Sequence, residues 1–426
     1  MSRQLRTISA DNPAEVLAAL RSALVGDGPA ILPLPEVLAA TDPFAATDPF
    51  AATDAPDAPN TTDARTRVLG GVPLPVAVVI ETSGSTDAPK RVMLSTDALL
   101  SGAAATTVAL GGPGQWLLAL PTHYVAGVQV LVRSIAADTS PVILPPGRFD
   151  PLVFAECAEQ LTEPLRYTSL VPVQLARLVD AADDPRVLDV LRRFTAILVG
   201  GQAMPPELIL RARELGVRVV RTYGSSETSG GCVYDGLPIG NTAVRVASMG
   251  ESSGELEISG SVLAEGYLND PVRTADRFID DHGVRWYRTG DLGEVDAESG
   301  AVRVLGRADN VIISGGVKVS LDAVERVVRT VAGFVDAVVV PAADAEWGQV
   351  PVVVVADHDA SGIDGRSASD RVAVPAELAG AVASVLGKAA RPARVVTVAS
   401  IPMLASGKPD RQALRSLVSR GNPAKP

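Results

Sequence analysis

The sequence predicts an α/β protein with a large N-terminal domain, in which largely parallel sheets are flanked by helices, and a small α+β C-terminal domain. From about residue 66 to residue 306, short β-branched apolar runs alternate with amphipathic stretches of helical spacing, the pattern typical of such sheets. A chain of 426 residues also exceeds the usual size of one hydrophobic core. Beyond residue 306 a second compact set of strands and helices follows, so we expect domains at 1–306 and 307–426.

Hydrophobic spacing predicts the individual elements along the chain. Apolar residues recur with helical spacing in residues 12–25, where Asp11 or Asn12 before Pro13 provides a helix start. Residues 39–64 contain the repeat AATDPF, which is rich in turn formers and too short for a solenoid unit, so a flexible loop is predicted there. The same reasoning predicts strands at 76–80, 116–120, 142–144, 196–199, 217–220, 335–340, 352–356 and 395–398, and helices at 171–178, 205–215, 321–330, 375–386 and 411–419.

Composition narrows the classes of function. The net charge of −11 and the pI near 4.9 argue against a nucleic-acid or anionic-membrane surface, which needs clustered Lys and Arg. The two cysteines, Cys157 and Cys232, lack metal-ligand spacing and do not suggest a disulfide framework. The N-terminus has no apolar signal core and no apolar run is long enough to span a bilayer, so we expect a cytoplasmic protein that acts on small molecules. The sequence does not determine the oligomeric state, and a homodimer is compatible with it.

The stretch Glu81 to Lys90, ETSGSTDAPK, has the composition of a phosphate-binding loop. It follows a buried β-branched strand, and its glycine, hydroxyls and free N–H groups can approach and donate to phosphate oxygens, while Lys90 adds a positive charge. Taken alone, such a run is more often an ordinary turn.

Further stretches combine groups suited to a nucleotide. A glycine pair and Gln202 end the strand at 196–199, and Tyr223 shares a loop with Glu227, so an aromatic face and a magnesium-binding carboxylate lie near each other. Asp291 and Arg307 could hold a ribose diol, and Lys408 lies on a predicted turn. Each also has a structural interpretation as a turn, a core tyrosine, a surface ion pair or a solvated lysine.

Together, and in this order, the motifs resemble those of the adenylate-forming superfamily of acyl-CoA ligases, peptide-synthetase adenylation domains and luciferases. The resemblance covers roughly residues 70–415. It is carried by the stretches TSGSTDAPK, YGSSET, GELEISGSVLAEGYL, YRTGD, GRADNVIISGGVKVSLDAVE and PMLASGKPDR.

The resemblance implies an enzyme that uses ATP and Mg²⁺ to convert a carboxylic acid into an acyl-adenylate, which the thiol of coenzyme A then attacks. Lys408 and Mg²⁺ would supply the positive charge that phosphoryl chemistry requires. By this resemblance, the pyrophosphate end of ATP is bound by Thr82, Ser83, Gly84, Ser85, Thr86 and Lys90, and Mg²⁺ lies near Thr86 and Glu227. Thr228 contacts the α-phosphate, and the ribose is bound by Asp291 and Arg307. Adenine is bound by Gly200, Gly201, Gln202, Tyr223 and Gly224.

The resemblance also implies that the C-terminal domain is mobile and rotates about Asp309 between the two half-reactions. Lys408 would then leave, and Ser314, Gly315 and Gly316 would enter to line the coenzyme A tunnel. The glycine pair could equally be an ordinary hairpin turn.

The acid is predicted from the segment around PTHYVAG. His123 matches the superfamily residue that lies near the acyl carboxylate and gates the path of the thiol, and with Lys408 and Glu227 it is one of the three predicted catalytic residues. Arg133, in an apolar segment, could neutralise a second carboxylate on the substrate or form a structural ion pair. Here the chain is most similar to actinobacterial members that ligate an aromatic dicarboxylate. Weaker substrate-binding candidates are Ser169, Ser229, Gly230 and Gly231.

Two departures from the superfamily pattern keep alternatives open. Asp87 stands where a glycine is usual in the phosphate loop, and the N-terminal part is shorter than in typical members. A carboxylate facing a triphosphate would weaken ATP binding, so we expect Asp87 to point outward. The alternatives are a ligase for another aryl or aliphatic acid, and a non-catalytic nucleotide-binding homologue.

Overall fold

The computed structural model describes residues 2–35, 68–82, 89–247, 253–356, 371–403 and 408–420. The predicted loop at 39–64 lies outside these ranges. The chain divides into two compact units: unit 1 comprises Met1–Ala243 and Ile258–Tyr287, and unit 2 comprises Val244–Glu257 and Arg288–Pro426.

Unit 1 contains a mixed six-stranded sheet in the order β15-β5-β4-β2-β1-β3. Strand β2 is parallel to β1 and β4, whereas β3, β5 and β15 pair antiparallel with their neighbours. Residues 76–80 of β4 are all buried, as expected for a strand covered on both faces. The bounds are β1 Ser2–Ser9, β2 Ala30–Leu34, β3 Val68–Pro73, β4 Val76–Thr82, β5 Lys90–Ser95 and β15 Gly266–Tyr267.

A second, seven-stranded sheet of unit 1 has the order β12-β11-β10-β9-β8-β6-β7. The five strands from β10 to β7 are parallel, and β11 and β12 continue the sheet antiparallel. The parallel strands all end at one edge, where ligands bind in open α/β sheets. The bounds are β6 Gln115–Leu118, β7 Val142–Ile143, β8 Arg166–Leu170, β9 Ala196–Val199, β10 Val219–Ser225, β11 Gly230–Tyr234 and β12 Leu237–Pro238.

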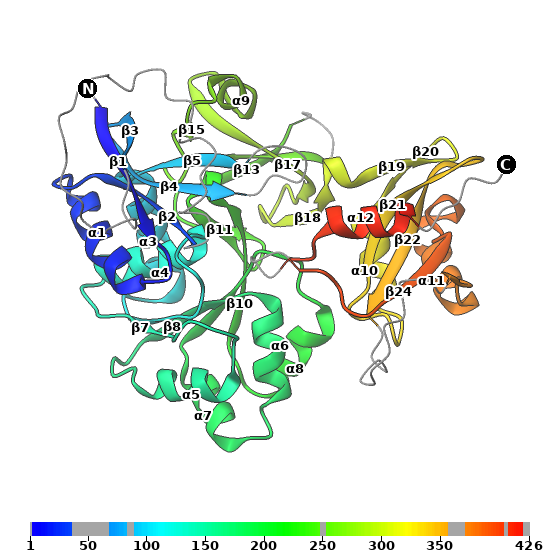
Figure 1. Ribbon diagram of the computed structural model, residues 1–426, viewed down its shortest axis with the longest axis horizontal. Helices are drawn as coiled ribbons and strands as arrows, with labels where there is room; N and C mark the ends of the chain where they lie inside the picture. Colours follow the sequence, from blue (N-terminus) through cyan, green and yellow to red (C-terminus); the bar gives the residue numbers. More distant parts are fainter. Residues whose placement is uncertain are drawn as a thin grey trace, which may run out of the picture. The chain divides into compact units, whose positions relative to one another are not determined.

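Helices of unit 1 lie between and outside the two sheets (Figure 1). The helix α3 contacts β4 and β5 of the first sheet and β11 of the second, and α4 contacts α3, β6, β8 and β11. Aspartates 150, 184 and 270 cap the helices that follow them by accepting backbone N–H bonds. The bounds are α1 Pro13–Val25, α3 Thr96–Leu110, α4 Val125–Ala136, α5 Pro151–Glu159, α6 Pro172–Asp180, α7 Pro185–Arg193, α8 Pro206–Glu214, the 3₁₀ turn η2 Ser226–Thr228, and α9 Pro271–Arg277.

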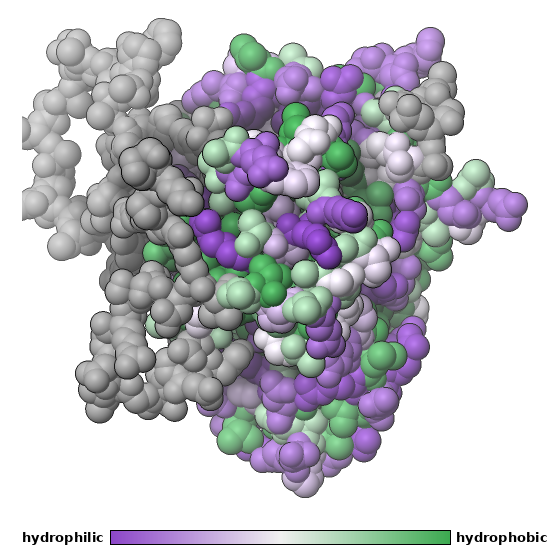
Figure 2. Space-filling view, turned by 90° about the vertical axis from the view of Figure 1, so that its right-hand side faces the viewer, coloured by the Kyte–Doolittle hydropathy of each residue, from purple (hydrophilic) through white to green (hydrophobic). Residues whose placement is uncertain are grey.

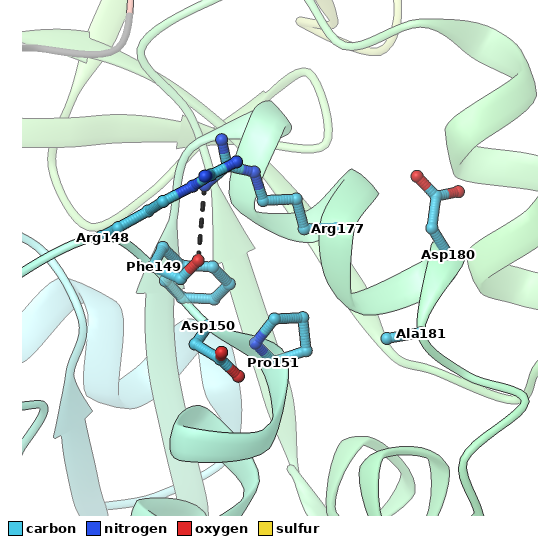
Figure 3. Close-up of a pocket in the computed structure, with 7 residues that line it drawn as sticks. All are labelled: Arg148, Phe149, Asp150, Pro151, Arg177, Asp180 and Ala181. Carbon is cyan, nitrogen blue, oxygen red and sulfur yellow. Dashed lines mark hydrogen bonds between the residues drawn. The ribbon is translucent and has the colours of Figure 1, made fainter. Parts of the chain in front are cut away.

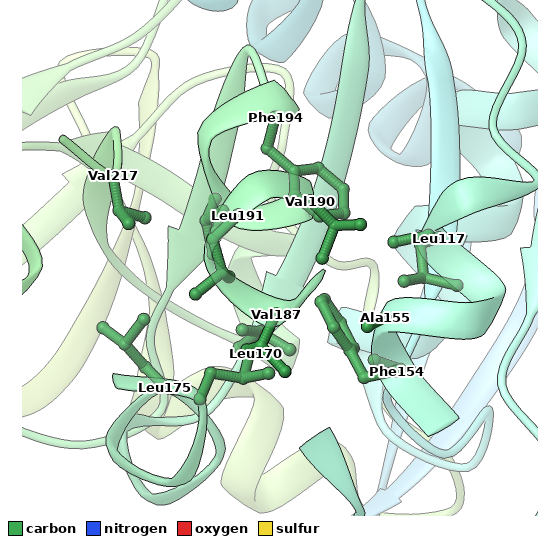
Figure 4. Close-up of a cluster of buried hydrophobic side chains, with 14 of the residues drawn as sticks. Leu117, Phe154, Ala155, Leu170, Leu175, Val187, Val190, Leu191, Phe194 and Val217 are labelled. Atoms are coloured by element: carbon green, nitrogen blue, oxygen red, sulfur yellow. The ribbon is translucent and has the colours of Figure 1, made fainter. Parts of the chain in front are cut away.

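The hydrophobic core beneath the second sheet is formed by the helices that cover its outer face. Phe154 of α5 and Phe194 after α7 pack with their ring centroids 5.8 Å apart. Buried aliphatic side chains from β6, β8, α6 and α7 surround the two rings (Figure 4). This packing fixes the strands whose ends carry the predicted site.

A third sheet, in the order β13-β14-β17-β16 with β18 beside β17, carries the YRTGD motif within β17. The boundary between the two units passes through β14 and β17. The bounds are β13 Ala243–Val246, β14 Ser253–Ser259, β16 Phe278–Asp281, β17 Val284–Val295 and β18 Val302–Arg307.

The rest of unit 2 is a six-stranded sheet, β20-β19-β22-β24-β23 with β21 beside β22, covered by helices on both faces. Side chains alternate along β21: Val339 packs with α10 and α11, and Val338 and Val340 pack with α12. The bounds are η3 Ala308–Asn310, β19 Val311–Ser314, β20 Val317–Ser320, α10 Leu321–Val328, β21 Val338–Asp344, β22 Gly348–Ala356, β23 Arg371–Val372, α11 Ala376–Leu386, η4 Lys388–Ala390, β24 Arg394–Val398 and α12 Arg411–Arg420.

The surface shown in Figure 2 has hydrophilic and hydrophobic side chains interspersed among the residues drawn in colour, a mixture that is normal where side chains meet solvent. Among the described helices, none combines the length and the apolar character that a membrane crossing requires.

The predicted α/β fold is confirmed, with corrections of detail. Residues 222–225 belong to β10 instead of to a loop, and Thr82 ends β4. The stretch from 243 to 306 is dominated by strands instead of alternating strands and helices. Short β-branched runs do not reveal whether their neighbours in the sheet run parallel, which is why the sequence missed this third sheet. The domain boundary near residue 306 stays a prediction.

Candidate active site

Lys90, Glu227 and Tyr267 form a buried polar cluster in unit 1. The Nζ atom of Lys90 donates to Oε1 of Glu227 at 2.5 Å, and the Tyr267 hydroxyl donates to the same oxygen at 2.8 Å. The Glu227 side chain is only 3% exposed, whereas that of Lys90 is 29% exposed. Residues from β5, η2 and β15, far apart in the sequence, therefore meet at one carboxylate.

The charge state of this cluster follows from its partners. Burial by itself would raise the pKa of Glu227, but the charge and hydrogen bond of Lys90 and the hydrogen bond of Tyr267 hold that pKa below its usual value. Burial and the neighbouring carboxylate raise the pKa of Tyr267. Glu227 is therefore ionised and Tyr267 is a neutral hydrogen-bond donor at neutral pH.

The predicted adenine-binding residues lie together at the ends of β9 and β10. Gly200 follows β9, and a Cβ there would lie 2.3 Å from the Thr222 hydroxyl on β10. A Cβ on Gly224 would lie 2.1 Å from the Gly230 carbonyl oxygen of β11. Only glycine permits these close approaches, which bring Tyr223 and the η2 turn to the same edge of the sheet.

The loop before α4 places His123 in unit 1 with both ring nitrogens buried and without a hydrogen-bond partner among the described residues. Burial lowers the pKa of His123, partly offset by Asp11. The imidazole is therefore neutral at pH 7. The hydroxyls of Ser225 and Ser229 are also buried without a partner among the described residues. Unsatisfied buried polar atoms are uncommon, so each of these groups is a candidate to receive a partner from a ligand.

Gln129 and Arg133 are the two long polar side chains of the largely apolar α4. Gln129 donates to the Ser229 carbonyl at 2.7 Å, and its Oε1 has no partner among the described residues. One turn later Arg133, 5% exposed, donates to the Tyr234 hydroxyl at 3.4 Å and lies 4.9 Å from the centre of the Trp116 ring. No salt bridge to Arg133 is present in the described part of the chain, so the structural ion-pair interpretation has no support there.

Unit 2 brings together the two residues predicted to bind the ribose. Arg307 donates to Asp291 at 3.1 Å and to Asp309 at 3.3 Å. Burial opposes the charge, yet Asp309 and Asp291 raise the pKa of Arg307. The predicted hinge residue therefore shares one guanidinium with the predicted ribose carboxylate.

The predicted coenzyme A loop forms the turn between β19 and β20. Gly315 and Gly316 both have positive φ angles, 56° and 81°, as a two-residue hairpin of the I′ type requires. Ser314 is buried in β19, and Lys408 is exposed at the start of the segment before α12. The turn interpretation is therefore correct for the backbone, and the role in coenzyme A binding stays a prediction.

The remaining predicted residues are placed as follows. Ser169 is buried in β8 beside β9, and Thr228 is buried and bonded to the Gly230 carbonyl. Ser229, with φ of 52°, Gly230 and Gly231 lie at the start of β11 or just before it. Gly201 and Gln202 follow Gly200 after β9. Ser83, Gly84, Ser85, Thr86 and Asp87 lie outside the described residues.

A separate surface pocket of about 510 Å³ lies between the β7–α5 connection and the end of α6 (Figure 3). It is lined by Arg148, Phe149 and Arg177, among others, and Arg177 donates to the Phe149 carbonyl. It contains none of the predicted site residues. The buried polar groups around Glu227 and α4 therefore define the candidate site better than this surface hollow does.

The sequence-based prediction missed three residues that contact the site. Tyr267 lies in the GELEISGSVLAEGYL stretch, which was noted as a whole, but nothing in the sequence shows that its hydroxyl reaches Glu227. Gln129 is an amide on an apolar helix face, the same signal that singled out Arg133 one turn later. In the sequence, nothing distinguishes Tyr234 from other strand residues; its contact with Arg133 depends on the packing of β11 against α4.

The ionised carboxylate of Glu227 is a group that Mg²⁺ can use as a ligand, although Lys90 and Tyr267 both donate to its Oε1 in this structure. Mg²⁺ is commonly held by one or two carboxylates together with substrate phosphates and water. The described residues contain no cluster of three or more His, Cys, Asp or Glu side chains suited to hold a metal by themselves. Binding of such an ion by Glu227 stays a prediction.

The fold and these motifs define a class of nucleotide-binding enzymes, and comparison with known proteins identifies it. The AMP-binding enzyme model matches residues 19–268, and the AMP-binding enzyme C-terminal domain model matches residues 323–408. The chain belongs to the AMP-binding enzyme family, which confirms the resemblance inferred from the sequence.

Several relatives with similar sequences are named as ligases for 2-succinylbenzoate. A probable 2-succinylbenzoate–CoA ligase of Mycobacterium tuberculosis (strain H37Rv) is 40% identical over 80% of this chain and 84% of its own length. The o-succinylbenzoate CoA synthetase of Bacillus subtilis, solved with its acyl-adenylate intermediate, is 25% identical with a TM-score of 0.67 over 80% of this chain and 69% of that chain. The same enzyme was solved with ATP and a magnesium ion, with a TM-score of 0.63 at 25% identity over 80% of this chain and 70% of that chain.

Proposed function

We propose that this enzyme joins 2-succinylbenzoate to coenzyme A in an ATP-dependent reaction that passes through an acyl-adenylate and serves menaquinone biosynthesis. The activity of the relatives described above supports this choice of acid. The observation that carries it within this chain is Arg133, a buried guanidinium with no carboxylate partner among the described residues. An unpaired buried charge is costly, and a dicarboxylate substrate would supply the missing anion.

In the first half-reaction, a carboxylate oxygen of the acid attacks the α-phosphorus of ATP and pyrophosphate leaves. Lys408 neutralises charge that develops around the phosphorus. Thr82 and Lys90 hold the pyrophosphate end together with the residues Ser83 to Thr86. Mg²⁺, when bound, offsets the negative charge of the phosphates. Glu227 is the carboxylate that would hold it, with Thr86 nearby.

The nucleotide-binding roles follow the motifs named above. Tyr223 and the glycine-rich end of β9 bind adenine, and Asp291 and Arg307 bind the ribose. The 3.1 Å bond between Arg307 and Asp291 keeps the carboxylate in a fixed direction, which suits a carboxylate that accepts hydrogen bonds from ribose hydroxyls. Thr228 approaches the α-phosphate.

In the second half-reaction the thiolate of coenzyme A attacks the acyl carbon and AMP leaves. Rotation about Asp309 removes Lys408 and brings Ser314, Gly315 and Gly316 to the thiol path. His123 lies beside the acyl group as a neutral imidazole, so it adds no second cation that would compete with Arg133 for the carboxylates.

An acid panel tests this proposal. The full chain is incubated with ATP, Mg²⁺, coenzyme A and, separately, 2-succinylbenzoate, benzoate and a medium-chain fatty acid, and AMP and thioesters are measured. We expect efficient turnover with 2-succinylbenzoate alone. Turnover of only the fatty acid or benzoate would indicate a ligase for another acid, and ATP binding without AMP from any acid would indicate a non-catalytic homologue.

The variant Arg133→Ala separates the substrate role of this residue from a structural one. We expect its activity to fall with 2-succinylbenzoate and to change little with an acid that has one carboxylate. An equal fall with both acids would contradict the assignment of Arg133 to the second carboxylate.

A further inference from the structure

The guanidinium of Arg133 is held between two aromatic side chains. Its Cζ lies 4.9 Å from the centre of the Trp116 ring, and its Nη2 donates to the Tyr234 hydroxyl at 3.4 Å. The Nε atom is buried and has no partner among the described residues. Two contacts thus restrict the side chain while part of its hydrogen-bonding capacity is left for another group.

The hydrogen bonds beyond Tyr234 have a defined direction. The Thr106 hydroxyl donates its only hydrogen to the Gly102 carbonyl at 2.8 Å, so it can only accept from the Tyr234 hydroxyl, 2.8 Å away. Tyr234 therefore donates to Thr106 and presents a lone pair to Arg133. All of these atoms lie in buried residues or in the backbone of α3.

This direction determines what Tyr234 can do. A hydroxyl that pointed its hydrogen at Arg133 would repel the guanidinium, whereas the lone pair attracts it. The chain from Arg133 through Tyr234 and Thr106 to the α3 backbone links α4, β11 and α3, three elements that pack against one another. The position of the guanidinium is thereby fixed by the fold before any substrate arrives, which lowers the entropy cost of binding an anion.

We propose that Tyr234, supported by Thr106, is a positioning residue that orients Arg133 toward the second carboxylate of the substrate and so determines the preference for dicarboxylic acids. This inference rests on the proposed function, because it assigns the same carboxylate to Arg133. Tyr234 acts through Arg133 and does not contact the reacting atoms.

The test compares two acids in variants of the full-length enzyme. The acids are 2-succinylbenzoate and 4-oxo-4-phenylbutanoate, which lacks the ring carboxylate. The variants are Tyr234→Phe, Thr106→Val and Arg133→Ala. Tyr167→Phe is the matched control, because it also deletes a buried tyrosine hydroxyl, one that donates to the carbonyls of Leu110 and Gly112 instead of contacting Arg133.

We expect Tyr234→Phe to raise KM for 2-succinylbenzoate by about 5- to 20-fold, because one hydrogen bond to a charged group is lost. The kcat should stay within about twofold, and KM for 4-oxo-4-phenylbutanoate should not change, as is usual when only substrate binding is affected. Thr106→Val should act in the same direction with a smaller effect, since it removes the support of Tyr234 and leaves both Tyr234 and Arg133 intact. Tyr167→Phe should leave the ratio of the two KM values as in the wild type.

The outcomes distinguish this inference from the proposed function. If the wild type releases no AMP with 2-succinylbenzoate, the proposed function fails and the inference fails with it. If the wild type is active and Arg133→Ala loses its preference for the dicarboxylate, while Tyr234→Phe and Thr106→Val keep it, only the inference is overturned. Equal changes of KM for both acids would show that Tyr234 has a structural role. If Tyr234→Phe does not fold, Thr106→Val decides by the same criterion.

Discussion

The ammonium group of Lys90 lies 2.5 Å from the carboxylate of Glu227, so the cation that ends the predicted phosphate loop is paired with the residue predicted to bind magnesium. Both are expected to contact ATP or its metal ion. Without a nucleotide, each neutralises the other, and the buried carboxylate keeps a counter-ion. Tyr267 holds the same oxygen with a neutral donor.

Removing Lys90 should destabilise unit 1. Lys90→Met leaves Glu227 buried without its cation, and we expect a loss of about 1–3 kcal/mol in the free energy of unfolding, less than is typical of fully buried pairs because Lys90 is partly exposed. Denaturant unfolding of Lys90→Met, Glu227→Gln and the double variant measures the coupling. Additive losses in the double variant would contradict a direct interaction between the two side chains.

The pair also predicts how stability depends on pH. The pKa of Glu227 in the folded state lies below its ordinary value of 4.5, so the folded state binds fewer protons than the unfolded state in that range. The contribution of Glu227 to stability is therefore complete above pH 4.5 and is lost as the pH falls through the folded-state pKa. Subtracting the profile of Glu227→Gln from that of the wild type isolates this contribution. In Lys90→Met, no cation offsets the burial of Glu227, so burial raises the pKa of its carboxyl above the ordinary value. We therefore expect the contribution of Glu227 to stability to fall, instead of rise, as the pH increases. An unchanged difference profile in Lys90→Met would be evidence against the pairing.

Gly224 should tolerate no side chain. A Cβ at this position would lie 2.1 Å from the Gly230 carbonyl, so Gly224→Ala must separate β10 from β11. We expect a loss of about 2–4 kcal/mol in stability and weaker ATP binding. Gly380→Ala is the matched control: this exposed glycine lies within α11 with open space around it, and the change should stabilise by roughly 0.5–1 kcal/mol. Thermal unfolding of both variants measures the contrast, and similar shifts in the two would mean that the close approach is not constraining.

Lys408 should matter for one half-reaction only. We expect Lys408→Ala to slow acyl-adenylate formation by at least about 100-fold, since a positioned charge on a phosphoryl transition state is lost. Thioester formation from supplied acyl-adenylate should be nearly unaffected. Rapid-quench measurement of the two half-reactions distinguishes them. Equal loss of both steps would refute the assignment of Lys408 to the adenylation conformation.

The sequence was a good guide where local pattern determines structure. The buried strand predicted before the phosphate loop is β4, and the helices predicted at 12–25, 171–178 and 205–215 are present as α1, α6 and α8. The ribose pair was also predicted, because Asp291 and Arg307 each belong to a recognisable motif, and the register of β17 and β18 places them opposite each other.

The sequence was a poor guide where a contact depends on how distant elements pack. Tyr267 and Glu227 are 40 positions apart, and only the pairing of β15 with β5 brings the hydroxyl to the carboxylate. Tyr234 reaches Arg133 because β11 turns back along β10 beside α4. No local periodicity encodes such contacts, so the residues that orient the candidate site became visible only in the structure.

The central claim is most directly tested with 2-succinylbenzoate whose carboxylates carry ¹⁸O. Attack of a carboxylate on the α-phosphorus, followed by thiol displacement, leaves one oxygen of the acid in AMP. The full-length enzyme is incubated with the labelled acid, ATP, Mg²⁺ and coenzyme A, and the products are analysed by mass spectrometry. AMP should carry a single ¹⁸O from the attacking carboxylate, and the second ¹⁸O of that carboxylate should be in the thioester carbonyl. Label in inorganic phosphate together with ADP, or no AMP at all while ATP is bound, would contradict the account.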